Sequence, residues 1–228
     1  GQGSDLTNFQ NPAMVDPDQR QRLDHYRLPE HFSVGVPWLQ LMLWFCAGSP
    51  LLASRCLPGS AWRIYLLRIF GAQIGIGCRL KPGLRVKYPW RLQVGPHCWL
   101  GEDVWIDNLA EVCIGEHACL SQGVYLCTGN HNYRSAGFDL CCAPIVIGDG
   151  AWLAAQVTVA PGVKVGSDAV VGIGSVVLSS VPDAVVWQGN PAQFRGWRWR
   201  RSNGSAAPCR ITLNEQDLPA VSVSDERR

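Results

Sequence analysis

An aliphatic residue returns at every sixth position through most of this chain, commonly beside a glycine. Neither the helical period of 3.6 nor the strand period of 2 produces a repeat of six, which is typical of a parallel β-helix. The spacing therefore predicts a solenoid of short strands in which three hexads close one triangular coil. In the second half the series is Ile147, Leu153, Val159, Val165, Val171 and Val177.

The first half carries the same repeat in three triplets that start 20 residues apart. Coils of this kind stack about 4.8 Å apart through backbone hydrogen bonds, with the aliphatic residue inside the prism. The residue four positions later also points inward and must be small, as at Cys78, Cys98 and Ala110. Fifteen hexads predict five coils, more than the roughly three repeats that a solenoid needs. The triplets are Ile74, Leu80, Val86; Val94, Leu100, Ile106; and Ile114, Leu120, Leu126.

Composition limits the classes of function. The 228 residues are 17% charged with a formal net charge of +2, which gives no reason to expect a nucleic-acid partner. Ten cysteines lack zinc-finger spacing, and two of them fill inward positions, so we interpret them as reduced thiols. No secretory signal precedes them, which predicts a cytoplasmic protein.

The chain divides into four expected segments. Residues 1–33 predict an irregular arm, 34–72 a helical cap, 73–196 the hexad domain with an inserted loop at 128–146, and 197–228 a basic, then polar, disordered tail. The uncharged run 34–54 is as long as a bilayer span, but prolines and glycines interrupt it. Two interpretations stay open for 34–70: a cap on the solenoid, or a peripheral membrane contact at the inner membrane face with Trp38, Trp44 and Trp62 at the interface.

The hexad repeat stops after Leu126 and resumes only at Ile147. A solenoid does not need such an excursion to fold, and long loops on a rigid scaffold usually carry function. His131 lies at the root of the inserted loop. It is therefore a candidate functional residue, and the alternative is an ordinary loop histidine.

Several segments together indicate a family. They are 66–72, 86–90, 125–131, 144–148, 152–154, 159–163 and 189–192. In these segments, and over roughly residues 36–196, the chain resembles the hexapeptide-repeat acyltransferases, which fold as a left-handed parallel β-helix. The colanic acid biosynthesis type of O-acetyltransferase is most similar, and maltose and galactoside acetyltransferases are more distant. The resemblance implies a homotrimer that transfers an acetyl group from acetyl-CoA to a saccharide hydroxyl, such as an exopolysaccharide unit or its precursor, without a metal ion.

The resemblance also assigns His131 as the general base. A hydroxyl group is a poor nucleophile near neutral pH, and a histidine that removes its proton accelerates attack on a thioester roughly 10²–10⁴-fold. Asp139, Asp107 or a backbone carbonyl is expected to orient the ring. The expected acceptor contacts are Asp107, Asn108, Asn130 and Tyr133.

Acetyl-CoA is expected in a groove between two neighbouring prisms of the trimer. The arginines that follow Pro191 would meet its phosphates as charge-assisted donors; contact with anionic lipid, or a solvated start of the tail, are the alternatives for this basic cluster. The cofactor residues implied by the resemblance are Trp152, Ala154, Ala155, Ile173, Gly174, Leu178, Ser179, Arg195 and Arg198.

Three other functions remain as alternatives. A serine acetyltransferase-like enzyme would use a small amino-acid acceptor instead of a sugar. A zinc carbonic anhydrase-like site would use His97 and His117, which lie 20 residues apart and should stack on one wall, but it needs further ligands. A non-catalytic scaffold would not need His131.

Overall fold

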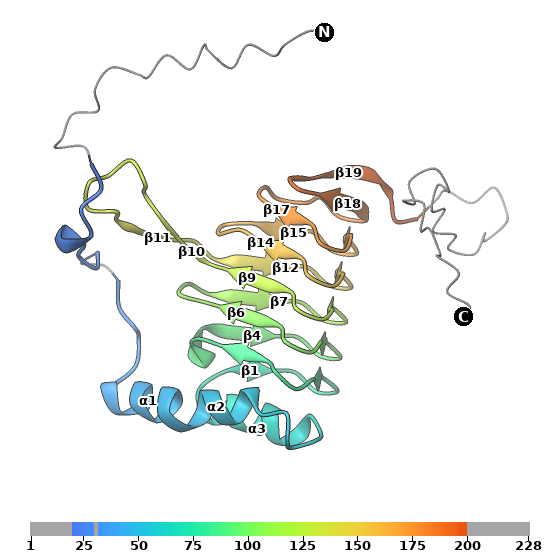
Figure 1. The fold of residues 1–228 in the computed structure, drawn as a ribbon. Helices are drawn as coiled ribbons and strands as arrows, with labels where there is room; N and C mark the ends of the chain where they lie inside the picture. The colour runs from blue at the N-terminus through green and yellow to red at the C-terminus, as the bar shows by residue number, and fades with distance from the viewer. Residues whose placement is uncertain (1–19, 30–31, 200–228) are drawn as a thin grey trace, which may run out of the picture.

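The computed structural model describes residues 20–29 and 32–199. Short strands stack coil upon coil, and helices lie across one end of the stack (Figure 1). Among these residues, none of the helices has both the length and the apolar character that crossing a bilayer requires. The tail expected to be disordered lies outside the described residues from position 200 onward. The helices are η3 (Leu23–His25), α1 (Trp38–Leu43), η4 (Trp44–Gly48), α2 (Ser49–Ala53), α3 (Ala61–Ile69) and η5 (Pro89–Arg91).

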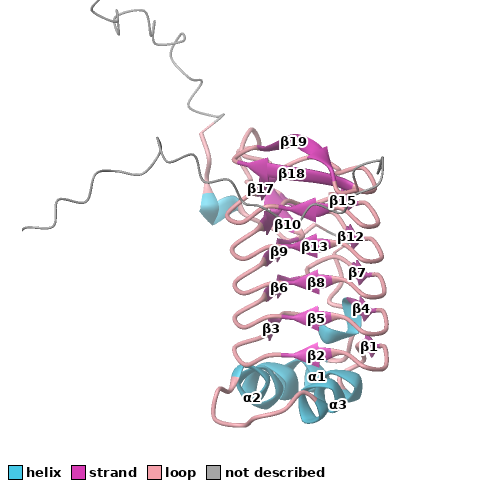
Figure 2. Cartoon of the chain, turned by 90° about the vertical axis from the view of Figure 1, so that its right-hand side faces the viewer, coloured by secondary structure: helices cyan, strands magenta, loops and turns pink. Residues whose placement is uncertain are grey.

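Three sheets form the walls of the prism (Figure 2). Sheet A contains β1 (Gln73–Ile74), β4 (Leu92–Val94), β7 (Val112–Ile114), β12 (Ile145–Ile147) and β15 (Lys164–Val165). Sheet B contains β2 (Arg79–Leu80), β5 (Trp99–Leu100), β8 (Cys119–Leu120), β13 (Trp152–Leu153), β16 (Val170–Val171), β18 (Val185–Gly189) and the antiparallel β19 (Ala192–Trp197). Sheet C contains β3 (Arg85–Val86), β6 (Trp105–Asp107), β9 (Tyr125–Cys127), β14 (Thr158–Val159) and β17 (Val176–Val177).

The register keeps the hexad aliphatics of successive coils opposite one another, as in Leu80 with Leu100. The expected parallel β-helix is therefore confirmed, with five complete coils and in addition a shortened sixth. In that last coil Val181 follows Val177 by only four residues and forms a β-bridge with Val165. Strand β18 then joins sheet B. The hexad count missed this coil because the next sixth position, 183, holds an aspartate instead of an aliphatic residue.

The core is a continuous stack of buried aliphatic side chains, joined by small residues such as Cys98. The prediction that Ala110 points inward is wrong, because its side chain is only half-buried. The two-residue extension of each early coil lengthens the turn from sheet C to sheet A. As a result Val112, two positions later, takes the buried place.

Glycines line the turns from sheet A to sheet B, which we call the AB edge. A Cβ on Gly95 would lie 2.6 Å from the backbone nitrogen of Glu116, and one on Gly148 would lie 2.5 Å from that of Ser167. Real Cβ atoms do not approach a backbone so closely, so glycine at these positions is what allows successive coils to stack.

The helical end packs on the first coil. Trp44, Leu52 and Leu67 are fully buried and belong to the same core as the coils. The indole nitrogen of Trp44 donates a 2.9 Å hydrogen bond to the carbonyl oxygen of Lys87. The buried guanidinium of Arg63 donates to three backbone carbonyls in the connection before α3, which compensates its lost hydration.

Candidate active site

The interrupting segment forms an antiparallel hairpin of β10 (Gly129–His131) and β11 (Leu140–Cys142), which projects from the prism (Figure 1). It leaves after β9 and returns at β12, so it lies at the edge between sheets C and A, here called the CA edge. His131 is the last residue of β10 and pairs with Leu140. The hairpin ladder therefore fixes the backbone of His131 at a rigid edge of the solenoid.

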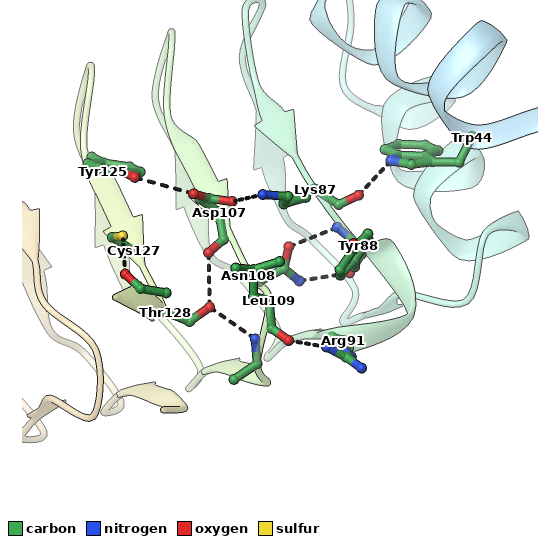
Figure 3. Close-up of polar contacts among 12 residues, drawn as sticks. Trp44, Lys87, Tyr88, Arg91, Asp107, Asn108, Leu109, Tyr125, Cys127 and Thr128 are labelled. Carbon is green, nitrogen blue, oxygen red and sulfur yellow. Dashed lines mark hydrogen bonds and ion pairs between the residues drawn. The ribbon is translucent and has the colours of Figure 1, made fainter. Parts of the chain in front are cut away.

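The root of the hairpin is bonded to the preceding coil (Figure 3). Thr128 is fully buried, and its hydroxyl donates to the Asp107 carbonyl and accepts from the Ala110 amide, both at 3.0 Å. One coil below, the Asn108 side chain accepts from the Tyr88 amide at 2.9 Å and donates to the Tyr88 carbonyl at 2.7 Å. These bonds replace backbone pairing where the edge departs from regular strands.

The imidazole of His131 is held by Phe138. Its Nδ1 atom lies 2.8 Å from the Phe138 carbonyl oxygen, and the two rings stack with centroids 4.2 Å apart and planes 4° apart. A carbonyl oxygen only accepts hydrogen bonds, so Nδ1 carries the proton in the neutral ring. The lone pair is then on Nε2, which is the state that a general base needs.

Of the three orienting groups left open by the sequence, the structure places a backbone carbonyl against the His131 ring. In the described part of the chain neither candidate carboxylate is bonded to the His131 ring. Asp139 is exposed, and only its backbone carbonyl is used, accepting from the Asn132 amide at 2.8 Å. The Asp107 carboxylate contacts Lys87 and Tyr125 instead.

Asp107 is the centre of a polar cluster at the CA edge, beside Cys127 in the ladder (Figure 3). One carboxylate oxygen lies 3.0 Å from the Lys87 ammonium, and the other accepts from the Tyr125 hydroxyl at 3.4 Å. Burial, with Cys127 and Asp107 nearby, raises the pKa of Tyr125. The phenol therefore stays neutral and keeps its proton as a donor to Asp107.

The N-terminal arm also reaches the hairpin, which sequence reasoning did not predict (Figure 1). The Arg22 amide donates to the Ala136 carbonyl at 2.8 Å, and the Tyr26 ring lies 5.9 Å from that of His131. An aromatic residue in a polar segment is the one sequence signal that could have indicated Tyr26. Phe138 carried no separate signal beyond its place in the loop.

A hollow of about 370 Å³ lies between the arm, the hairpin and the neighbouring CA turn. Two residues of β11 line it: Cys142, which pairs with Gly129 of β10, and Leu140, which pairs with His131. Because directly paired residues of an antiparallel ladder project to the same face, the His131 side chain is on the same face of the hairpin as this hollow. Its walls include Phe32, Ser33, Arg91, Glu111, Leu140 and Cys142.

The predicted acceptor residues separate into two groups. Asn130 and Tyr133 are exposed on the hairpin with His131, and the Asn130 side chain accepts from the His131 amide at 2.8 Å. Asn108 is fully buried, and both of its polar groups are bonded to Tyr88. The structure therefore does not bring Asn108 to the exposed surface of the hairpin.

The predicted cofactor residues lie on two edges of one prism. Ala154 and Ala155 follow β13, Ile173 and Gly174 follow β16, and the Gly174 amide donates to the Ala155 carbonyl at 2.9 Å. This is the edge between sheets B and C, next to the exposed Trp152 of β13. Leu178 and Ser179 follow β17, two strands beyond β9 in sheet C, and so lie on the CA edge with the hairpin. None of these residues lines the 370 Å³ hollow or a second, shallow groove of about 690 Å³ along sheet A.

The two predicted phosphate-binding arginines differ. Arg195 is exposed on β19. Arg198 lies at the AB edge, where its guanidinium donates to the carbonyls of Gly150 at 2.7 Å and Asp168 at 3.1 Å and pairs with the Asp168 carboxylate at 3.5 Å. Arg198 thus ties the chain after β19 to the solenoid, away from the edges that hold the other predicted cofactor residues.

His97 and His117 stack at the AB edge with ring centroids 5.0 Å apart, as their spacing predicted. Among the described residues no group of three histidine, cysteine, aspartate or glutamate side chains is placed to hold a metal ion. All nine cysteines in that part of the chain are free thiols.

No protein-family model matches the chain. Over 172 residues it is 41% identical to WcaF of Escherichia coli (strain K12), which bears the name of a colanic acid biosynthesis acetyltransferase; the match covers 75% of this chain and 94% of that protein. Serine acetyltransferase 2 of Arabidopsis thaliana is 33% identical over 110 residues, 48% of this chain and 34% of that one.

Two solved structures with the same fold are acetyltransferases. The hexapeptide-repeat acetyltransferase VCA0836 of Vibrio cholerae, complexed with acetyl-CoA, superposes with a TM-score of 0.65 at 24% identity and covers 74% of this chain and 93% of its own. A maltose O-acetyltransferase of Clostridium difficile 630 gives a TM-score of 0.64 at 23% identity, covering 71% and 88%. These likenesses establish the fold.

Proposed function

The chain belongs to the hexapeptide-repeat acetyltransferases of the colanic acid biosynthesis type, and we propose that it acetylates a hydroxyl group of a saccharide with His131 as the general base. The observation that carries the proposal is the 2.8 Å contact between Nδ1 of His131 and the Phe138 carbonyl. It leaves Nε2 unprotonated on a hairpin anchored to a rigid scaffold. Membership of the family supports the acetyl transfer itself.

The reaction needs one base and one leaving thiol. Nε2 takes the proton of the acceptor hydroxyl while its oxygen attacks the thioester carbonyl carbon of acetyl-CoA. The tetrahedral intermediate then collapses, the carbon–sulfur bond breaks, and the imidazolium returns the proton to the departing thiolate. The Phe138 carbonyl accepts from Nδ1–H throughout, so it favours the protonated ring that forms in the first step.

The acceptor binds in the hollow between the arm and the hairpin. Its volume of about 370 Å³ suits one or two sugar rings, since small-molecule sites begin near 300 Å³. The walls combine the ring of Phe32 with the charged groups of Arg91 and Glu111, which suits a molecule with apolar ring faces and several hydroxyls. Tyr133 is exposed on the hairpin beyond His131, whereas Asn130 projects to the opposite face of β10 and bonds the His131 amide.

A serine acetyltransferase-like reaction is the second candidate, favoured by the 33% identity over 110 residues. The hollow is larger than a single serine needs, and this supports the saccharide.

The donor is acetyl-CoA, and the functional unit is a homotrimer. In one prism the residues at Ala154–Ala155 and Ile173–Gly174 lie a full sheet away from Leu178, Ser179 and the hairpin. A ring of prisms would place the BC edge of one subunit against the CA edge of the next, which supports a groove built by two subunits. Light scattering after gel filtration measures this: a monomer that is active would contradict it.

The test of the function is acceptor-dependent loss of thioester absorbance from acetyl-CoA across sugars, nucleotide sugars, lipid-linked saccharides and serine. We expect turnover with a saccharide and a 10²–10⁴-fold lower kcat in His131→Ala. His97→Ala, an exposed histidine at the AB edge, is the matched control and should retain activity. Full activity in His131→Ala would remove this base from the mechanism, and turnover with serine alone would favour the second candidate.

A further inference from the structure

The helical end presents an apolar face to the outside. From Trp38 to Ala53 the chain is helical without a break, and it runs across the end of the solenoid (Figures 1 and 2). Its inner stripe of Trp44, Gly48 and Leu52 is buried. The outer side carries no charged residue at all. The exposed residues are Trp38, Leu39, Met42, Leu43, Phe45, Cys46, Ala47, Pro50 and Leu51.

A surface helix of a globular protein normally has polar residues opposite its buried stripe. This helix is apolar on both sides, and Trp38 is 73% exposed. Further exposed apolar side chains lie on the same end: Leu57, Tyr65 and Ile69. Scattered apolar residues are normal on a surface, but a contiguous patch marks a site of interaction.

The charged residues of the helical end and of the first coil have one sign. Residues 31–101 contain eight lysines and arginines and not one aspartate or glutamate. Arg79, Lys81 and Arg85 are exposed on the first coil, next to the helical end; the guanidinium groups of Arg79 and Arg85 lie over the rings of Trp99 and Trp105 of the second coil. Among the other cations, Arg55 pairs with Asp103 of the second coil, and Arg63 is buried. The helical end is therefore apolar at its tip and cationic around it.

We propose that this end docks on the surface of an anionic lipid bilayer. The helix would lie in the plane of the interface, with its outer side chains about 5–10 Å deep and the basic residues of the first coil near the lipid phosphates. The aromatic rings of Trp38 and Tyr65 suit the headgroup level. Buried apolar area and cationic charge both strengthen binding to an anionic bilayer, and this end of the molecule has both.

A second copy of the chain fits this face less well. Two identical ends placed face to face in an isologous contact would bring the cationic coils of both molecules together with no acidic residue in 31–101 to oppose them. An anionic lipid surface supplies the missing negative charge. An anionic bilayer is therefore the partner that this face fits, and self-association through it would contradict the proposal.

Docking would also set the height of the active site. The hairpin leaves the third coil, so the spacing of strands places it roughly 10–15 Å above the helices. This step rests on the proposed function: a saccharide carried on a lipid headgroup could reach His131 at that height. The acceptor would then be a membrane-bound precursor and not a free sugar.

Vesicle flotation tests the docking without reference to catalysis. We expect the full chain to float with vesicles of phosphatidylethanolamine and phosphatidylglycerol, and much less with phosphatidylcholine alone. The double variant Leu39→Glu with Met42→Glu should lose binding, whereas Phe194→Glu, an exposed apolar residue of β19 at the opposite end, should not. Lys81→Gln should weaken binding about fivefold, and Lys164→Gln on β15 should not change it.

Light scattering on the same variants identifies any other occupant. A wild-type chain that never floats, or a double variant that binds vesicles as well as wild type, would overturn the proposal. The proposal would also be overturned if the wild type did not bind vesicles and the double variant formed a smaller oligomer than the wild type. That result would assign the face to a contact with a second copy of the chain. Retained activity of the double variant on a water-soluble acceptor separates lost docking from lost catalysis.

Discussion

The Phe138 carbonyl accepts from Nδ1 of His131 at 2.8 Å while the Phe138 ring stacks on the imidazole. One residue thus fixes both the tautomer and the plane of the His131 imidazole. Phe138 achieves this at φ +51°, a left-handed conformation that costs a non-glycine residue free energy. Such conformations cluster at functional sites, where surrounding contacts hold them.

Removing the Phe138 ring should therefore misplace the base. Phe138→Ala is expected to lower kcat by up to about 10²-fold, because small displacements of a catalytic group are costly, and to leave the KM for acetyl-CoA unchanged. Phe138→Tyr retains the stacked ring and should keep kcat near that of the wild type. Alanine and tyrosine both meet the positive φ of this position, so the comparison of the two variants isolates the ring. Steady-state kinetics of the two variants check this; equal activity in both would show that the ring does not position His131.

The carboxylate of Asp139 should be dispensable. It is exposed, and the backbone of this residue, not its side chain, holds the loop. We expect Asp139→Asn to change kcat by no more than about twofold, as for an ordinary surface substitution. A loss comparable to that of His131→Ala would mean that this carboxylate, and not the Phe138 carbonyl, orients the base during turnover.

Gly148→Ala should destabilise the solenoid. Its Cβ would lie 2.5 Å from the Ser167 backbone, which cannot move without disturbing the coil above. We expect the free energy of unfolding to fall by about 1–3 kcal/mol, the usual cost of overpacking. Gly196→Ala on β19 meets no atom within 4 Å and is the control. Denaturant titration followed by circular dichroism measures both, and an unchanged Gly148→Ala would refute the close-stacking argument.

Alkaline pH should destabilise the core through Cys98. Burial raises the pKa of this thiol from 9.0 to about 11. Because the folded state holds the proton more tightly, the stabilisation is complete below pH 9 and is lost as the pH rises toward 11, at up to about 1.4 kcal/mol per pH unit. Stability measured across this window should fall less steeply in Cys98→Ala than in wild type. The exposed Cys56→Ala is the control, and parallel slopes in all three proteins would contradict the prediction.

The fold was predictable because every coil repeats the same local rule. An aliphatic residue at each sixth position has one way to be buried, and Leu80, Leu100 and Leu120 duly stack in one sheet. The place of the candidate site could be proposed from the sequence for the opposite reason. A break in a strict repeat is conspicuous, and His131 lies in that break.

The contacts of the site were not predictable. A backbone carbonyl leaves no trace in the sequence, so Phe138 could not be distinguished from Asp139 as the partner of His131. Tyr26 lies more than 100 residues earlier, and no periodicity links it to the hairpin. Asn108 was expected to bind the acceptor because the resemblance places the acceptor-binding asparagine of related enzymes near it. Its side-chain amide instead bonds the backbone of Tyr88.

The shortened sixth coil and β19 have a consequence for how the molecule behaves in solution. A parallel β-helix is in principle endless, since each coil offers unpaired amides and carbonyls to another identical coil. Here β19 turns back antiparallel on β18, and the helices packed around Trp44 cover the opposite end. The two ends therefore differ in structure, which opposes head-to-tail addition of molecules into a fibre.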